Sequence, residues 1–99
     1  NALRSNTKGW WNTAVGTGAL RSDTSGYNNS ALGFHSLYNS INGSDNAAFG
    51  TAAMFENTSG NNNVAMGFSS LYSNKTGSNN VALGYESLYN DTSGISNIA

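Results

Sequence analysis

The sequence predicts an all-β repeat protein, a parallel β-solenoid or β-roll built from coils of 17 residues. Three features predict it. Glycines recur in register along the chain, short stretches alternate between bulky apolar and small or polar residues, and turn-forming residues follow those stretches. The absence of proline from the 99 residues suits uninterrupted ladders of strands.

The repeat keeps a step of 17 residues without an insertion or deletion. Two glycine series follow this step: Gly16, Gly33, Gly50, Gly67 and Gly84, and Gly9, Gly26, Gly43, Gly60, Gly77 and Gly94. An apolar series also follows it: Leu3, Leu20, Leu37, Met54, Leu71 and Leu88. The chain is therefore interpreted as one repeat array over residues 1–99, with units at 12–28, 29–45, 46–62, 63–79 and 80–96 and partial units at both ends. Because both ends fall inside a unit, we expect the chain to be a segment of a longer fibre. We also expect that fibre to be a homotrimer, for the reasons given below.

The unit at residues 80–96 illustrates the predicted coil. Residues 80–84 alternate, so Val81 and Leu83 are predicted to point into the coil and the small residues between them to point the other way. A second short strand is predicted at residues 87–89, with Leu88 facing the core. Residues 90–94 have the composition of a turn. The alternative for residues 84–89 is a single helical turn, which is too short to be stable alone.

Three apolar side chains per coil make a thin core. Each buried Leu or Val contributes about 1.5–3 kcal/mol, whereas ordering the backbone costs roughly 1–2 kcal/mol per residue. We therefore expect further burial between chains. Alanine side chains allow another backbone to approach closely, so an intersubunit face around a threefold axis is predicted at the alanine series. That series is Ala14, Ala31, Ala48, Ala65 and Ala82. Small residues that merely face solvent are the alternative.

Two runs carry a resemblance to a known family. NVALGYES at residues 80–87 and NVAMGFSS at residues 63–70 resemble the YadA-like head repeat of trimeric autotransporter adhesins. NTAVG at residues 12–16 is similar to repeats of bacterial and phage tail-fibre-like surface proteins. The resemblance covers the whole chain, although the unit here is longer than the family's. It implies a left-handed parallel β-roll, a homotrimer, an extracellular location at a cell or virion surface, and adhesion.

Two series are candidate sites. The asparagines are expected to form a ladder of side-chain amides between stacked coils, with a polar row that binds glycan as the alternative. They are Asn12, Asn29, Asn46, Asn63, Asn80 and Asn97. An aromatic column offers candidate glycan contacts, with packing between coils or chains as the alternative. Its residues are Tyr38, Phe55, Tyr72 and Tyr89, continued by Arg4 and Arg21. Trp10 and Trp11 interrupt the repeat and indicate either a contact with a neighbouring domain or subunit or a local surface patch.

The composition argues against several functional classes. Charged residues make up 9% of the chain, against about 25% in ordinary domains. Four Lys and Arg residues form no basic face for nucleic acid, and no apolar run is long enough for membrane insertion. With no cysteine and His35 as the single histidine, we expect no metal and no other cofactor. No converging pair of ionisable groups suggests an enzyme.

The leading functional prediction is a structural segment of an extracellular trimeric fibre, adhesin-like or tail-fibre-like, that acts as a rigid stalk or head in surface attachment. Its predicted partners are copies of itself and a host or surface glycan or protein. One alternative is a glycan-binding module that uses the aromatic column. The other is an ice-binding solenoid with a threonine column that two residues, Ile41 and Lys75, interrupt. That column is Thr7, Thr24, Ile41, Thr58, Lys75 and Thr92.

Overall fold

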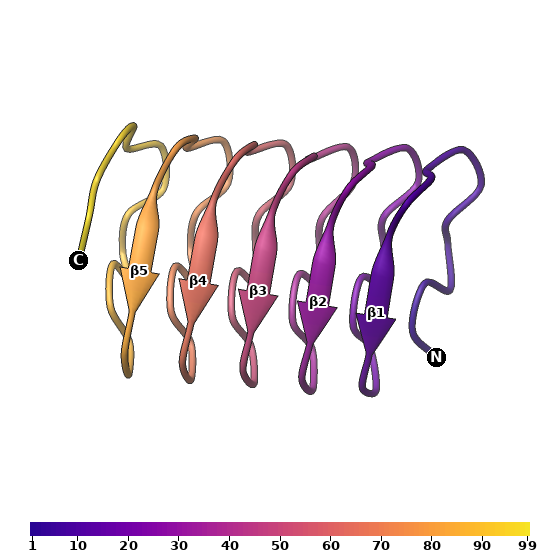
Figure 1. Cartoon of the computed structure of the whole chain (residues 1–99), viewed down its shortest axis with the longest axis horizontal. Helices are drawn as coiled ribbons and strands as arrows, with labels where there is room; N and C mark the ends of the chain where they lie inside the picture. The colour runs from indigo at the N-terminus through magenta and orange to yellow at the C-terminus, as the bar shows by residue number, and fades with distance from the viewer.

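Each 17-residue unit forms one coil, and the coils stack along the long axis of the molecule (Figure 1). The computed structural model describes residues 1–99 and measures 32 × 21 × 17 Å along its principal axes. Each coil contributes one strand to a single parallel sheet of order β1-β2-β3-β4-β5. The strands are β1 (Thr13–Val15), β2 (Ser30–Leu32), β3 (Ala47–Phe49), β4 (Val64–Met66) and β5 (Val81–Leu83). Neighbouring strands pair residues one repeat apart, such as Ala48 with Ala65. The predicted parallel β-solenoid and its period are confirmed.

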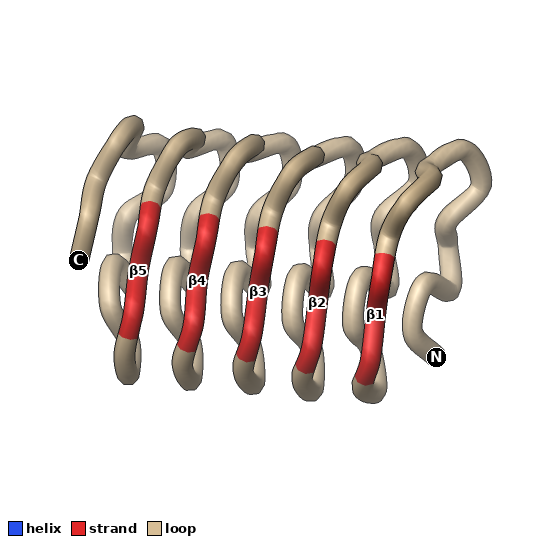
Figure 2. The backbone as a smooth tube through the Cα atoms, viewed as in Figure 1, coloured by secondary structure: helices blue, strands red, loops and turns tan.

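The second strand predicted in each coil is wrong. Residues 85–90 form turns, and Figure 2 shows one strand segment per coil with turns and loops along the rest of the wall. The reason is the left-handed backbone at Leu88, with φ 49°, which an extended strand cannot accommodate. The coils nevertheless stay hydrogen-bonded through this wall, since the amide of Leu71 donates to the carbonyl of Ser87 at 2.9 Å. The alternative helical turn does not form a helix, and no helix with the length and apolarity needed to cross a membrane is present.

The strands turn their alanines inward, opposite to the prediction. Ala31, Ala48, Ala65 and Ala82 are buried in the core of the single chain, whereas Val15 and Leu83 are exposed. The turn wall supplies the large side chains of the core, and the strand wall supplies the small ones across from them. The core cluster is Ala19, Leu20, Ala31, Leu37, Ala48, Ala53, Met54, Ala65, Leu71 and Ala82.

The assignment of Ala14, Ala31, Ala48, Ala65 and Ala82 to an intersubunit face is therefore wrong. Four of these side chains have no more than 2% of their surface exposed, and the remaining one, Ala14, packs against the same core. A side chain that is already covered by its own chain has no surface left for a neighbouring chain. The coil is too narrow to hold large side chains from both walls, so the smaller residues of each strand occupy the inside. Leu88, in contrast, packs on the core as predicted.

The asparagine series forms a ladder of hydrogen bonds between stacked coils, mainly from the backbone amide of each asparagine to the side-chain oxygen of the preceding one. The side-chain oxygen of Asn63 accepts a hydrogen bond from the backbone amide of Asn80 at 3.0 Å. Its side-chain nitrogen donates to the carbonyl of Gly77 at 2.8 Å and to the side-chain oxygen of Asn46 at 3.1 Å. The backbone amide of Asn63 donates to that same Asn46 oxygen at 3.0 Å. Each buried amide thus joins the start of a strand to the preceding coil and to the turn that ends its own coil.

Gly60 shows why glycine recurs in those turns. A Cβ atom at this position would collide with the carbonyl oxygen of Gly77 in the next coil and with the side-chain oxygen of Asn57. Backbone segments of successive coils approach each other here without room for a side chain. The glycine series therefore lets the carbonyl groups reach the asparagine ladder.

The inverted orientation of the strand predicts different stability losses for two leucines in one coil. Leu37→Ala removes a fully buried side chain and is expected to lower the free energy of unfolding by about 2–5 kcal/mol. Leu32→Ala removes a side chain that is 50% exposed, so the isolated chain should lose less than about 1 kcal/mol. Urea denaturation followed by circular dichroism measures both losses. Equal losses would contradict this orientation.

The ladder makes a second prediction. Asn63→Ala leaves the buried amide of Asn80 without a partner, at about 1–3 kcal/mol. It also removes the hydrogen bonds that the Asn63 side chain donates to Gly77, whose carbonyl keeps the Asn74 donor, and to Asn46, at about 0.5–1.5 kcal/mol each. We expect a loss of roughly 2–5 kcal/mol in the free energy of unfolding. The control is Asn42→Ala at an exposed corner, which should change stability by less than about 0.5 kcal/mol. A small loss for Asn63→Ala in the same denaturation experiment would refute the structural role of the ladder.

Candidate functional site

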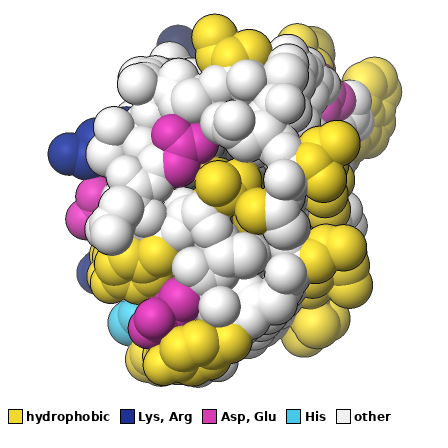
Figure 3. Space-filling model, turned by 90° about the vertical axis from the view of Figure 1, so that its left-hand side faces the viewer, with side chains coloured by type: hydrophobic (Ala, Val, Ile, Leu, Met, Phe, Trp, Pro, Cys, Tyr) yellow, Lys and Arg dark blue, Asp and Glu magenta, His cyan; other side chains and the backbone are white.

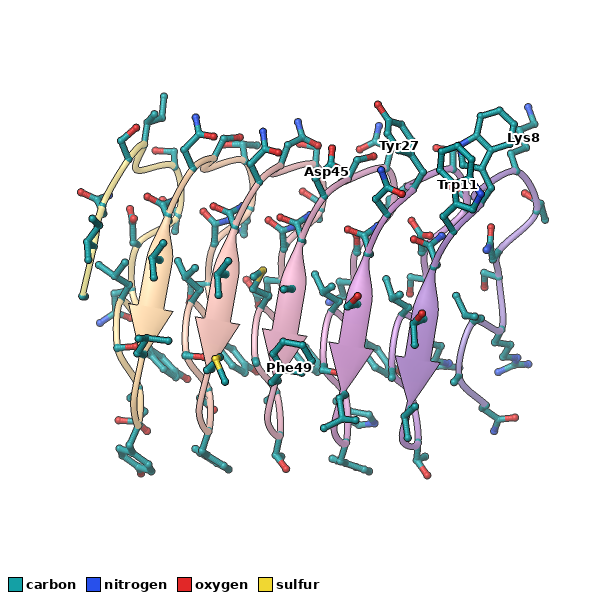
Figure 4. All side chains as sticks on the ribbon, viewed as in Figure 1. Lys8, Trp11, Tyr27, Asp45 and Phe49 are labelled. Atoms are coloured by element: carbon teal, nitrogen blue, oxygen red, sulfur yellow. The ribbon has the colours of Figure 1, made fainter.

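The outer face of the sheet carries an exposed apolar stripe, one side chain from each strand. The stripe consists of Val15, Leu32, Phe49, Met66 and Leu83. Val15 and Leu83 are both 55% exposed, and Met66 is 46% exposed. In the space-filling view, hydrophobic side chains gather along the right-hand side of the molecule, which is the strand side (Figure 3). Phe49 lies on this face, on the front of β3 (Figure 4).

The stripe follows from the strand alternation once the alanines are placed inside. Residues on either side of a buried alanine must point outward, because side chains alternate along a strand. The flanking positions Ala47, Val64 and Val81 are half-buried and widen the apolar surface. Neither series contains a charged residue. A continuous exposed apolar surface of this kind is typical of an interaction site rather than of a face that meets only water.

The predicted aromatic column forms, and its rings stack on one another. The ring centroids of Tyr38 and Phe55 are 5.0 Å apart, those of Phe55 and Tyr72 5.1 Å, and those of Tyr72 and Tyr89 4.9 Å. The rings of each pair lie within 7° of parallel. The Arg21 guanidinium lies 5.2 Å from the centroid of the Tyr38 ring. The faces of the inner rings are therefore occupied by neighbouring rings, and the column serves packing between coils better than it serves sugar stacking.

Burial affects the ionisation of this column. It raises the pKa of the Tyr72 hydroxyl above its usual value, and the neighbouring Tyr89 and Glu56 add to the effect. All these influences favour the neutral phenol at physiological pH. The column thus adds no negative charge of its own to that wall.

A groove of about 340 Å³ lies on the wall that carries the threonine column. It is lined by Ser22, Asn39, Ile41, Glu56, Thr58 and Lys75. The Thr58 hydroxyl donates to the carbonyl of Lys75 at 3.0 Å, and the Thr24 hydroxyl donates to the carbonyl of Ile41 at 3.2 Å. These hydroxyl protons link adjacent coils, and Ile41 and Lys75 interrupt the row. The wall therefore lacks the flat, regular array of free hydroxyls that an ice-binding face requires.

Asp23 is a buried carboxylate among neutral ladder residues. Its oxygens accept hydrogen bonds from the Gly26 amide at 2.9 Å and from the Asn12 side chain at 3.0 Å. Burial raises the pKa of Asp23 from 3.8 to about 6, although the Gly26 hydrogen bond opposes the shift. The equivalent positions in later coils include Asn57 and Asn74, both uncharged. The charge at Asp23 is thus a local cost to folding at neutral pH rather than a shared property of the repeat.

The remaining sequence candidates are dispersed. His35 stacks on Phe34 with ring centroids 3.7 Å apart, and no group of three or more His, Cys, Asp or Glu residues could hold a metal ion. Trp10 and Trp11 lie exposed at the corner before β1. The apolar stripe was missed as a site by sequence reasoning, because the same residues were assigned to the core. The alternation was visible, but its phase relative to the core was not.

Comparison with known proteins gives no relative. No family model matches the chain, and neither a curated protein nor a solved structure matches it significantly.

The raised pKa of Asp23 predicts a specific pH dependence. The folded chain binds the proton of the Asp23 carboxyl more tightly than the unfolded chain does. Protonated Asp23 therefore stabilises the fold, and this stabilisation is fully present below about pH 3.8. As the pH rises from 3.8 to about 6, the free energy of unfolding falls by roughly 2–3 kcal/mol. Above that pH, Asp23 causes no further change. Asp23→Asn should therefore raise the free energy of unfolding at pH 7.5 and remove this dependence. Denaturation midpoints between pH 3.5 and 7.5 measure it.

The matched control for this measurement is Asp45→Asn. Asp45 is an exposed carboxylate in a column that carries asparagine in other coils. This variant should keep the pH dependence of the original chain. A pH dependence that survives in Asp23→Asn would show that another group causes it.

Proposed function

We propose that this chain is a structural segment of an extracellular fibre in which copies associate in parallel through the apolar stripe of the sheet. The fibre would be a homotrimer that serves as a rigid stalk or head in surface attachment, in the manner of an adhesin or a tail fibre. The observation that carries the proposal is the stripe itself, which adds one apolar side chain per coil to the outer face of the sheet and leaves Val15 and Leu83 each 55% exposed.

The stripe fits a second copy of this chain better than an unrelated partner. Its side chains recur once per coil, at the strand spacing of about 4.8 Å. A partner that contacts every member must repeat with the same spacing over the same length. A parallel copy meets this condition by construction, and each further coil adds an equal contact. Burial of the exposed leucine, methionine and valine side chains would add about 25 cal/mol for each Å² of apolar surface removed from water.

The threefold arrangement rests on the resemblance to trimeric adhesin repeats. It is compatible with one apolar stripe per chain, because three such stripes can meet around a common axis in a closed assembly. The interface of this proposal differs from the one expected from the sequence. The strand side chains before and after each alanine, not the alanines, would form the contact.

The backbone hydrogen bonds between successive coils support the proposed role of the chain as a rigid rod. The chain contains 60 backbone–backbone hydrogen bonds, and many of them link one coil to the next, as between Leu37 and Ala53 at 2.9 Å. Stacked coils that contact only their neighbours extend without a limit set by the core. A chain in which only 9% of the residues are charged also makes fewer non-specific ionic contacts.

The test is the mass of the assembly in solution, measured by native mass spectrometry and sedimentation equilibrium. The original chain should form a species of three copies, and the double variant Leu32→Ser, Met66→Ser should shift it to single chains. The circular dichroism spectrum should stay unchanged, because both side chains lie outside the core. We expect at least a tenfold increase in the dissociation constant, which corresponds to about 1.4 kcal/mol.

The control variant is Ile41→Ser. Ile41 is exposed to a similar extent, at 47%, but lies on a different wall. Its substitution should leave the assembly intact. A chain that remains single at all concentrations, or an assembly that survives Leu32→Ser, Met66→Ser, would refute the proposed interface.

A further inference from the structure

Three exposed aromatic side chains lie at the corner that precedes the first strands. Trp10 is 63% exposed, Trp11 77% and Tyr27 43%. Trp10 and Tyr27 occupy equivalent positions in successive coils, and the carbonyl of Trp10 accepts a hydrogen bond from the amide of Asn28 at 3.2 Å. We name Trp10, Trp11 and Tyr27 the aromatic platform. It is separate from the apolar stripe and from the stacked aromatic column.

The backbone at Trp11 is unfavourable for a bulky residue. Its φ is 57°, in the left-handed region. The equivalent positions in other coils have nearly the same φ but carry small polar residues: Asn28, Asp45, Asn62, Asn79 and Ser96. Asparagine and aspartate tolerate this conformation, whereas a large side chain is strained in it. Leu37 and Leu71 also adopt a left-handed backbone, but each is fully buried and its packing in the core offsets the strain. Trp11 is 77% exposed and has no such compensation within the coil, so the tryptophan indicates a role that the coil itself does not need.

The rings of the platform offer faces that the aromatic column does not. Trp10 and Trp11 have centroids 5.9 Å apart and planes inclined by 37°, so they do not cover each other face to face. In the column, by contrast, Phe55 and Tyr72 lie within 3° of parallel and cover each other. The other strongly exposed aromatic rings also stack, Phe34 on His35 and Phe68 on Tyr85. At the platform, by contrast, a ligand finds ring faces that are not stacked on another ring.

The surroundings of the platform are polar and carry charges of both signs. Lys8, Trp11, Tyr27 and Asp45 follow one another along the same edge of the solenoid (Figure 4). The Asn28 side chain donates to the Asp45 carboxylate at 3.0 Å, which leaves the Asn28 oxygen and the other carboxylate oxygen as acceptors. A bilayer would require this rim to be desolvated, at a cost for each polar group. A sugar, in contrast, uses both kinds of group. Its C–H groups pack on the faces of aromatic rings, and its hydroxyls bond to amide or carboxylate groups.

We infer that the aromatic platform is a binding site for a neutral oligosaccharide whose pyranose rings carry equatorial hydroxyl groups. The axial C–H groups of such a ring lie on the indole faces of Trp10 and Trp11, and its hydroxyls donate to Asn28 and Asp45. A neutral sugar fits because Lys8 and Asp45 give the rim no excess of one charge. This inference does not depend on the association of chains through the apolar stripe.

The test uses the intrinsic fluorescence of the chain. Trp10 and Trp11 are its only tryptophans, so emission reports on the platform alone. Titration with cellohexaose and with chitohexaose should produce a saturable change in emission with at least one of them. Mannohexaose, whose rings carry an axial hydroxyl group that interrupts the C–H surface, should bind at least tenfold more weakly.

Trp11→Asn is the decisive variant. It places at this position the residue that Asn28, Asn62 and Asn79 provide in other coils, so the coil should fold with an equal or higher denaturation midpoint. Sugar affinity, read from Trp10 emission, should fall at least tenfold. Trp10→Tyr, which copies Tyr27, should retain binding within about threefold when read from Trp11.

Three outcomes would overturn the inference. One is the absence of a saturable change with either sugar in the original chain. Another is unaltered sugar affinity in Trp11→Asn. The last is a blue shift with neutral phosphatidylcholine vesicles that exceeds the effect of both sugars, which would identify the platform as a membrane contact.

Discussion

The hydrogen bonding of the buried asparagine amide is the interaction on which the rest of the structure depends. One side chain, such as Asn63, satisfies the amide of the next coil and the carbonyl of its own closing turn. It can do so only if the side chain points inward and the turn brings its carbonyl to the centre of the coil. Glycine at Gly60 and Gly77 permits that approach, because a Cβ atom would collide with the neighbouring coil. The period of the repeat is thus set by polar groups that must be satisfied in the absence of water.

An inward asparagine determines the orientation of the strand that follows it. Side chains alternate, so the alanine two residues later also lies inside and the residues between and beyond it lie outside. The core then receives its bulk from the opposite wall, where Leu37, Met54 and Leu71 adopt left-handed backbone conformations. The apolar outer stripe is a consequence of the same constraint. Because the inner side of each strand is taken by asparagine and alanine, the valine, leucine and methionine side chains of the same strand have to lie on the surface.

These relations explain which features could be predicted from the sequence. The step between equivalent glycines and asparagines gave the coil length and the parallel pairing, since stacked coils place equivalent residues on one another. The phase of the alternation could not be obtained in this way, because Val81 and Leu83 are more apolar than Ala82 and general rules place apolar residues inside. The narrow cross-section reverses this preference. The turn wall was also inaccessible, since leucine at a positive φ has no signature in composition or spacing. The interruption by Trp10 and Trp11, in contrast, was visible in the sequence, and it lies where the inferred sugar site is.

Departures from the repeat carry the most information about function in such an array. A regular residue is explained by the stacking that every coil shares, so it says little about a particular partner. Asp23 and Trp11 depart in different ways, one with a buried charge at a position that is neutral in several coils and the other with a strained bulky residue. Coils that contact only their neighbours can accept such a cost locally, because the rest of the stack keeps its own contacts. The two residues differ in whether a ligand can reach them. The Asp23 carboxylate is enclosed and used up by Gly26 and Asn12, whereas the Trp11 ring is presented to solvent, where a ligand can reach it.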